Sequence, residues 1–260
     1  PVVLGSATPS LESWHNAQSG RYRMLRLSAR ALAAARLPAV RCVNINQTVM
    51  HHGISENLLR EIGQRIARRE QSLLFINRRG YAPVLMCTSC GWLSGCKHCA
   101  GKMVLHLNDK RLRCHHCGYQ LHVPHACPSC GNADLHPVGS GTQRVESVLQ
   151  ERFPDARILR VDRDSTRNKR AWQTMREQIH ANEVDILVGT QMLAKGHDFP
   201  ALTLVGVLNP DSALYSSDFR AAEKLFAQLA QVAGRAGRAD KPGEVIIQTA
   251  FPDHPLYRAL

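Results

Sequence analysis

The sequence has no long apolar run and few aromatic residues. Its longest apolar stretch, residues 201–208, contains Thr203 and Gly206 and is much shorter than the ~18 to 20 residues of a membrane-spanning helix. Phe, Trp and Tyr make up 5% of the chain, whereas hydrophobic residues make up 44% and charged residues 21%. This balance is that of a globular protein, and it excludes collagen, a coiled coil and a disordered chain.

A secretory signal and an initiator methionine are also missing. The chain begins with Pro1 and lacks the basic and apolar segments that open a secreted precursor. We therefore expect a fragment of a longer protein in the cytoplasm, where thiols stay reduced.

The sequence contains fewer acidic than basic residues. Thirty-three Lys and Arg residues stand against twenty-one Asp and Glu residues, which gives a net charge of +12. Residues 1–41 contain six arginines and a single acid, Glu12. Such an excess favours a polyanionic partner such as nucleic acid, although a solvated basic surface has the same composition.

Cysteine is concentrated in one segment. Eight of the nine cysteines lie within residues 87–130 as four Cys-x-x-Cys pairs, and Cys42 stands apart. The pairs are Cys87 and Cys90, Cys96 and Cys99, Cys114 and Cys117, and Cys127 and Cys130. Two such pairs complete a tetrahedral zinc site, so four pairs predict two zinc ions. Disulfides are the alternative, which a reducing cytosol disfavours.

The spacing of the pairs bears on which of them share an ion. Fourteen residues separate Cys99 from Cys114, close to the spacing of a zinc ribbon, whereas five separate Cys90 from Cys96. We expect the two inner pairs to share one zinc and the two outer pairs the other, with sequential pairing as the alternative. Four thiolates close the coordination sphere, so both sites are expected to be structural and not catalytic.

The cysteine-rich segment is also basic. Lys97, Lys102, Lys110, Arg111 and Arg113 lie in or beside its inner loop, and Trp92 and Tyr119 offer stacking surfaces. This combination suits single-stranded nucleic acid, although solvated lysines have the same pattern. Its histidines are not needed as ligands, because eight thiolates already fill two tetrahedra.

Strands and helices alternate in the rest of the chain. Apolar spacing predicts helices over residues 54–70, 142–152, 169–180 and 219–232, and strands over 73–76, 158–161, 184–189, 202–208 and 244–249. This alternation predicts an α/β fold, with a parallel sheet covered by helices on both faces. The two-zinc module would be inserted between the first strand and its crossover helix.

Two loops of this sheet carry residues that suit phosphate chemistry, because ligands bind at the carboxyl ends of parallel strands. Residues 189–200 leave a buried strand with two glycines and small polar groups. Residues 231–238 end a helix with Arg235 and Arg238, whose spacing places two guanidinium groups on one side. A pair of salt-bridging arginines is the structural alternative.

Taken together, these segments resemble the superfamily 2 helicases. Residues 5–10 are similar to motif III, 73–80 to motif IV, and the two loops to motifs V and VI, in that order. The eight-cysteine insertion after Asn77-Arg78-Arg79-Gly80-Tyr81, together with residues 139–146, resembles the PriA family of bacterial replication-restart helicases. The resemblance covers essentially the whole chain and also implies the nested zinc pairing.

The resemblance implies a role for individual residues. Arg238 would be the arginine finger at the γ-phosphate, with Arg235 beside it, Gln231 near the nucleotide, and Gly196 and Asp198 on its ribose and phosphate side. Thr190 and Gln191 would contact the DNA backbone, and Ser6 and Thr8 would couple hydrolysis to lobe movement.

The resemblance also implies a domain order and partners. Residues 1–45 would end the first helicase lobe and form a basic linker, residues 46–83 and 136–260 would form a second, RecA-like lobe, and residues 84–135 would be the inserted two-zinc module. It implies 3'-to-5' unwinding of forked and single-stranded DNA, with single-strand binding protein, PriB and DnaT as partners.

Half of the expected ATP site is not in this sequence. No Gly-x-x-x-x-Gly-Lys-Ser/Thr phosphate loop and no Asp-Glu-x-His box occur, so we expect the chain alone to hydrolyse no ATP with magnesium. Two other functions fit less of the sequence. A zinc-ribbon nucleic-acid binding module on a non-catalytic scaffold leaves the two motif-bearing loops unexplained, and a RecG-like branched-DNA translocase lacks the cysteine insertion.

Overall fold

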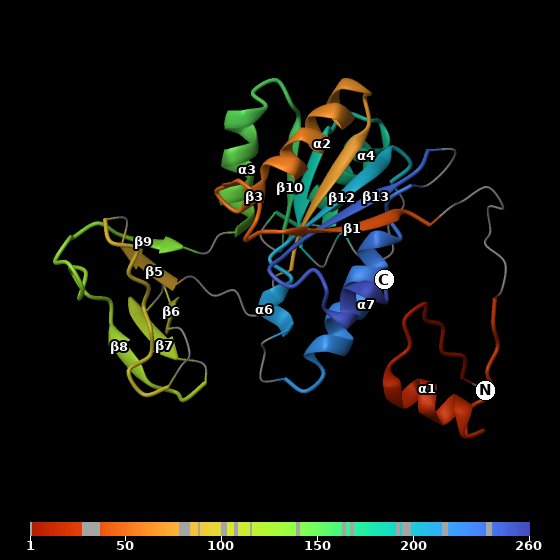
Figure 1. The fold of residues 1–260 in the computed structure, drawn as a ribbon, viewed down its shortest axis with the longest axis horizontal. Coiled ribbons are helices and arrows are strands. Elements are labelled where there is room, and N and C mark those ends of the chain that lie inside the picture. Colours follow the sequence, from red (N-terminus) through yellow and green to blue (C-terminus); the bar gives the residue numbers. More distant parts are fainter. Residues whose placement is uncertain are drawn as a thin grey trace. The chain divides into compact units, whose positions relative to one another are not determined.

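The computed structural model divides into two compact units (Figure 1). The large unit comprises Pro1–Asn77 and Val145–Leu260, and the cysteine-rich unit comprises Arg78–Arg144. The described residues are 2–27, 37–77, 84–87, 89–99, 103–106, 109–114, 116–138, 141–162, 165–166, 169–190, 193, 199–214, 218–237 and 241–260. Among them, no helix has the length and apolar character needed to cross a membrane.

A sheet of six parallel strands forms the centre of the large unit, in the order β1-β13-β12-β4-β11-β10. In that order the strands span Ala39–Asn44, Glu244–Thr249, Leu202–Leu208, Gln71–Ile76, Ile186–Gly189 and Ile158–Val161. Every residue of β4, β11 and β12 is buried, as expected for parallel strands covered on both faces. The predicted α/β fold with a parallel sheet is therefore confirmed.

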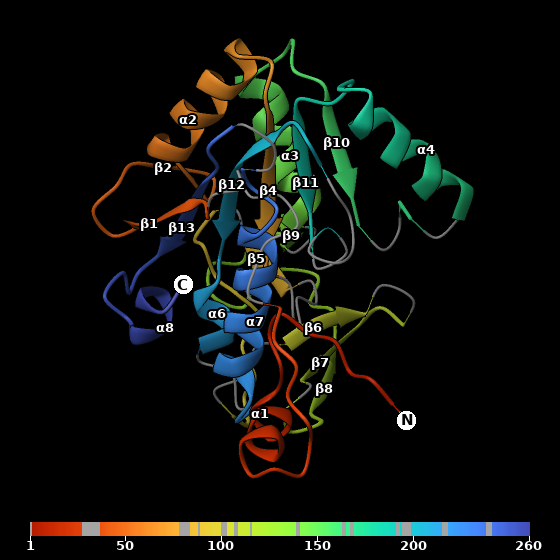
Figure 2. The same cartoon turned by 90° about the vertical axis from the view of Figure 1, so that its right-hand side faces the viewer.

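Helices cover both faces of this sheet (Figure 2). Alternation along β4 places Leu73 and Phe75 in one apolar core and Leu74 and Ile76 in the other. The first core includes side chains of α4, α7 and α8, which span Lys169–His180, Ala221–Ala233 and Pro255–Arg258. The second includes side chains of α2 and α3, which span Glu56–Ala67 and Gly141–Arg152.

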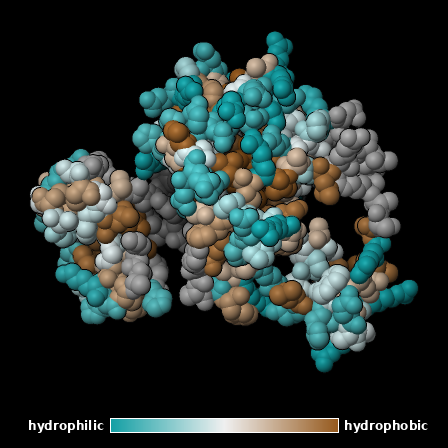
Figure 3. Space-filling view, viewed as in Figure 1, coloured by the Kyte–Doolittle hydropathy of each residue, from teal (hydrophilic) through white to brown (hydrophobic). Residues whose placement is uncertain are grey.

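Helix α2 shows how the sequence specifies one of these layers. Ser55 caps it, because its hydroxyl accepts a hydrogen bond from the Leu58 amide at 3.2 Å. Leu58, Leu59 and Ile62 recur at helical spacing and are buried against the sheet. The outer surface over α2 is mostly hydrophilic (Figure 3).

Three helix boundaries differ from the expectation by two residues or more. Residues Ile54–Ser55, expected to open a helix, form strand β3, which pairs with β2 (Met50–His51) in a small antiparallel ladder. The helix expected from residue 219 starts at Ala221, and the Phe219 side chain is exposed. The helix expected to run to residue 70 ends at Ala67. All three differences arise at helix ends, where neighbouring backbone contacts outweigh apolar spacing.

Strand β1 was not expected. Its residues fall in the segment interpreted as the end of one lobe and a linker, yet each pairs with β13, from Ala39 opposite Glu244 to Asn44 opposite Thr249. The inserted module therefore does not follow the first strand of the sheet, because β1 precedes β4 in the chain. Among its described residues, the large unit also contains α1 (Leu11–Gln18) and α6 (Asp211–Leu214).

The cysteine-rich unit contains two small antiparallel sheets. Strand β5 (Val84–Cys87) pairs with β9 (Leu135–Val138), and β7 (Arg111–Cys114) lies between β6 (Met103–His106) and β8 (Gln120–His122). Its buried apolar core consists of Leu85, Met103, Leu105 and Leu112. A core of this size does not hold a fold by itself, so the unit needs further cross-links.

Candidate functional site

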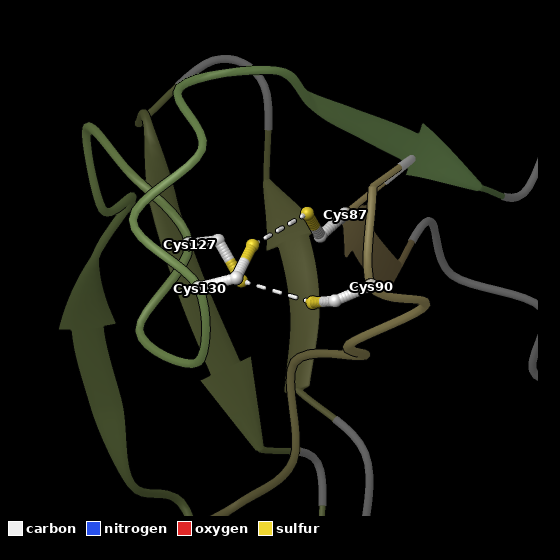
Figure 4. A group of neighbouring side chains, drawn as sticks. All are labelled: Cys87, Cys90, Cys127 and Cys130. Carbon is white, nitrogen blue, oxygen red and sulfur yellow. Dashed lines mark hydrogen bonds between the residues drawn. The ribbon is translucent and has the colours of Figure 1, made fainter.

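The cysteine sulfurs supply those cross-links in two groups of four. The outer group contains Cys87, Cys90, Cys127 and Cys130, and the inner group contains Cys96, Cys99, Cys114 and Cys117. Within each group all ligand atoms lie within 4.8 Å of one another. Figure 4 shows the outer group, in which side chains from two distant turns point toward one centre. The structure therefore has the nested pairing, not the sequential one.

The distances between sulfurs fit a metal site. Cys87 Sγ lies 3.6 Å from Cys130 Sγ, and Cys90 Sγ lies 3.6 Å from Cys127 Sγ. In the inner group, Cys96 Sγ lies 3.5 Å from Cys117 Sγ, and Cys99 Sγ lies 3.5 Å from Cys114 Sγ. A tetrahedral zinc with Zn–S bonds of about 2.3 Å places its sulfurs about 3.8 Å apart, whereas a disulfide requires about 2.05 Å. The donor set is thus suited to two structural zinc ions.

The backbone of each turn stabilises a thiolate. Cys87 has its pKa lowered to about 7, chiefly because the backbone N–H of Cys90 donates to its sulfur. Cys114 has its pKa lowered to about 6 by the N–H of Cys117 in the same way. Zinc binds the thiolate form, so these hydrogen bonds prepare one ligand of each group.

In the outer group, Cys130 is the thiol that keeps its proton. The N–H of Asn132 lowers the pKa of Cys130, but hydrogen bonds with the other thiols, Cys90 first, and burial outweigh it and raise this pKa to about 12. Four neighbouring thiols do not ionise together without a cation, because like charges repel. A zinc ion removes that repulsion.

A glycine follows three of the four cysteine pairs. Gly91, Gly118 and Gly131 have positive φ angles of 73°, 78° and 75°, which favour glycine. Each donates its N–H to the carbonyl of the first cysteine of the preceding pair, at 2.9 to 3.0 Å. The Cys-x-x-Cys-Gly pattern in the sequence carries this signal, which the cysteine spacing alone does not include.

The other expected residues that the structure describes lie at both edges of the large sheet. Contrary to the expectation for residues 231–238, the turn after α7 lies at the amino edge, because the Gly237 N–H donates to the carbonyl of Leu202, the first residue of β12. Thr190 directly follows β11, and its carbonyl accepts from the Leu193 amide at 3.1 Å. Gln231 lies in the last turn of α7. Arg235 lies in the turn beyond it, is half-buried, and interacts with another residue of the chain. Gln191, Gly196, Asp198 and Arg238 lie outside the described residues, as does Lys102 of the basic loop.

One hydrogen bond joins two of the expected motifs. The Gln231 side-chain amide donates to the Thr8 hydroxyl at 3.2 Å, across 223 positions of the sequence. Ser6 lies beside this contact in the chain, and its hydroxyl accepts from the Thr8 amide at 3.1 Å. The structure thus brings together Ser6, Thr8 and Gln231.

Helix α7 makes two further contacts with the N-terminal segment that were not expected. Glu223 accepts a hydrogen bond from the Leu11 amide at 2.9 Å, at the start of α1. Arg220 forms an ion pair with Glu12. No sequence signal points to these pairs, because more than two hundred positions separate their members.

Strand β4 ends at the carboxyl edge of the sheet with a buried polar residue. Asn77 is 4% exposed, and neither atom of its side-chain amide has a hydrogen-bond partner among the described residues. It opens the Asn77–Tyr81 motif, of which the other four residues lie outside the described part. An unpaired buried amide is costly, and this makes Asn77 a further candidate for a contact with a ligand or with that motif.

Two family models match parts of the chain. Residues 138–240 match the family "Helicase conserved C-terminal domain", and residues 96–121 match "PriA DNA helicase Cys-rich region (CRR) domain". Among solved structures, S. cerevisiae Dbp5 L327V bound to RNA and ADP BeF3 aligns with 94% of this chain and 44% of its own, at 12% identity and a TM-score of 0.44.

Curated relatives match along the chain. Replication restart protein PriA of Haemophilus influenzae is 48% identical over 259 residues, which are 100% of this chain and 35% of the relative. The protein of the same name from Bacillus subtilis is 46% identical over 98% of this chain and 32% of its own length. The chain thus spans about a third of the length of these relatives. In its two four-cysteine groups, its parallel sheet and these matches, the chain is similar over its whole length to about a third of the length of these PriA proteins.

Proposed function

We propose that this chain is the second motor lobe and zinc module of an ATP-dependent 3'-to-5' DNA helicase that acts in replication restart. The hydrogen bond between Gln231 and Thr8 is the observation that carries the proposal, because it links helix α7, which precedes Arg235 and Arg238 in the sequence, to the segment that resembles motif III. Such a link is what a motor needs if events at its nucleotide are to move its lobes.

The proposed chemistry rests on positive charge at the end of α7. Arg238 is the proposed arginine finger, with Arg235 beside it and Gln231 near the nucleotide. In well-studied enzymes an arginine finger raises turnover roughly 10³- to 10⁵-fold, because it stabilises negative charge that develops during phosphoryl transfer. The phosphate loop and magnesium box that hold ATP are not part of this sequence, so the chain alone is proposed to be inactive.

Contacts to the other ligands follow the same proposal. Gly196 and Asp198 are assigned to the ribose and phosphate side of the nucleotide, and Thr190 and Gln191 to the DNA backbone. Thr190 supports this assignment by its position, directly after a central strand at the edge where such sheets bind ligands. Single-strand binding protein, PriB and DnaT remain proposed partners, and the cytoplasm the proposed location.

The division into lobes is also a proposal. Residues 84–135 form the inserted two-zinc module, residues 136–260 together with 46–83 form the second lobe, and residues 1–45 contain the end of the first lobe. Because β1 pairs with β13 along its whole length, we extend the second lobe back to Ala39.

The coupling role gives the test. In the full-length protein, Thr8→Val removes the hydroxyl that Gln231 contacts and keeps the side-chain volume. We expect ATP hydrolysis to continue while strand separation on a forked DNA falls at least about tenfold, equivalent to the ~1.4 kcal/mol of one hydrogen bond. Thr174→Val, which removes an exposed hydroxyl from α4, is the matched control. Normal unwinding by the Thr8 variant would contradict the proposal.

A further inference from the structure

The three-stranded sheet of the cysteine-rich unit has one apolar and one polar face. Leu105 of β6 and Leu112 of β7 are buried on the side of the small core. Because side chains alternate along a strand, their neighbours His106, Arg111 and Arg113 lie on the opposite side. Arg111 and His122 are exposed, and His106 and Arg113 are half-buried.

Strand register arranges these side chains in two rows. His106 pairs with Arg111, which pairs with His122 on the next strand. In the second row Arg113 lies between Val104 and Gln120. Neighbouring strands are about 4.8 Å apart and alternate residues about 7 Å apart, so the donors form one compact patch. We name His106, Arg111, Arg113, Gln120 and His122 the basic face.

Little negative charge opposes the basic face. Asp109 pairs with Arg113, and Arg111 makes no ion pair among the residues that the structure describes. The unit has eight Lys and Arg residues against two acids, Asp109 and Asp134. Cys114 is buried and alternates with Arg113 on β7, so its sulfur lies on the other side of the sheet. The Cys114 thiolate therefore does not share the basic face.

We propose that the basic face binds the phosphate backbone of single-stranded DNA. A guanidinium group between two imidazoles presents a row of hydrogen-bond donors to phosphate oxygens, and flat rings beside them can stack on bases. An acidic peptide is the competing ligand, but peptide recognition relies on apolar anchors in pockets. Val104 is the single apolar side chain in the two rows, and Trp92 and Tyr119 pack against the small core instead.

The test uses the zinc-loaded 260-residue chain and a fluorescent oligothymidine of about twenty nucleotides. Arg111→Gln combined with His106→Gln and His122→Gln removes one row without adding negative charge. We expect affinity to fall at least tenfold, and the slope of log K against log salt to become shallower by about 0.7 for each phosphate that the variant no longer neutralises. Arg60→Gln on the exposed side of α2 removes one charge elsewhere and should change neither quantity.

Two results would overturn the proposal. One is an unchanged affinity and salt slope in the triple variant while it retains its zinc. The other is unchanged DNA binding together with weakened binding of an oligoglutamate peptide, which would assign the face to protein partners. The proposal specifies a DNA contact within the proposed function but does not depend on hydrolysis. If this face binds DNA but substitution of Arg235 and Arg238 leaves ATP hydrolysis unchanged, the proposed motor function is refuted and the DNA-binding proposal stands.

Discussion

Gly237 and Gly243 meet backbone to backbone beside the arginine-bearing turn. A Cβ atom on Gly237 would lie 2.3 Å from the Gly243 amide nitrogen, and Gly237 has a φ of 73°. Its N–H donates to the carbonyl of Leu202 at 3.1 Å, and the Gly243 carbonyl accepts from Ala39 at 2.9 Å. This junction therefore ties the turn that follows Arg235 to β12 and to the start of β1.

A side chain at this junction should displace the turn. Gly243→Ala is expected to lower the free energy of unfolding by about 1–3 kcal/mol, because the added methyl group overlaps backbone atoms that cannot rotate away. Denaturant unfolding of the chain measures the change. Gly63→Ala is the matched control, since its methyl group would meet Phe153 at an ordinary 3.5 Å and alanine favours the helix interior. Equal effects of the two substitutions would argue against a special junction.

Metal analysis should find two zinc ions per chain, one for each group of four sulfurs. Cys90→Ser is expected to reduce the content toward one, since three thiolates hold zinc less tightly, whereas Cys42→Ala should leave it at two. Removal of zinc by a chelator should unfold the cysteine-rich unit, whose apolar core has four buried residues. A chain that keeps the near-native spectrum of this unit without metal would show that the sulfurs are not its main cross-links.

Asp185 should make stability depend on pH in acid. Its pKa is lowered, first by the hydrogen bond from the Arg157 side chain and also by the Arg157 backbone N–H, although burial opposes the shift. A lowered carboxyl pKa stabilises the fold above the unfolded value of about 4, and this contribution disappears as pH falls through the folded value.

Asp185→Asn should therefore cost about 1 kcal/mol at pH 7, a modest figure because Arg157 is 52% exposed. The difference from the parent chain should shrink below about pH 4, where the parent carboxylate protonates. Thermal unfolding across this range measures it, with exposed Asp155→Asn as the control. A penalty that stays constant down to the lowest pH would contradict the assignment.

Regular local signals made much of the fold predictable. Helix α4 has the expected bounds, Lys169–His180, because Trp172, Met175 and Ile179 recur at helical spacing and pack on the sheet. Strands β10, β12 and β13 also have the expected bounds. Strand β1 was not predicted because Arg41 interrupts its apolar residues, and its pairing partner follows some two hundred positions later.

The candidate site was predictable where its residues recur at a characteristic spacing in the sequence. Four Cys-x-x-Cys pairs indicated two metal sites, because a structural zinc ion is commonly bound by two such pairs and each pair is recognised by its spacing in the sequence. The sequence did not predict the contact between Gln231 and Thr8, although each residue belongs to a recognisable motif. Tertiary folding alone brings them together, as it does Glu223 and the Leu11 amide.

The proposed function requires this chain to supply the arginine side of an ATP site. The most direct measurement is DNA-stimulated ATP hydrolysis by the full-length protein with Arg238→Ala, compared with exposed Arg60→Ala. We predict a loss of turnover of roughly 10³-fold or more with most nucleotide affinity retained, and no loss in the control. Unchanged turnover in the Arg238 variant would contradict the claim and leave a zinc-stabilised scaffold in its place.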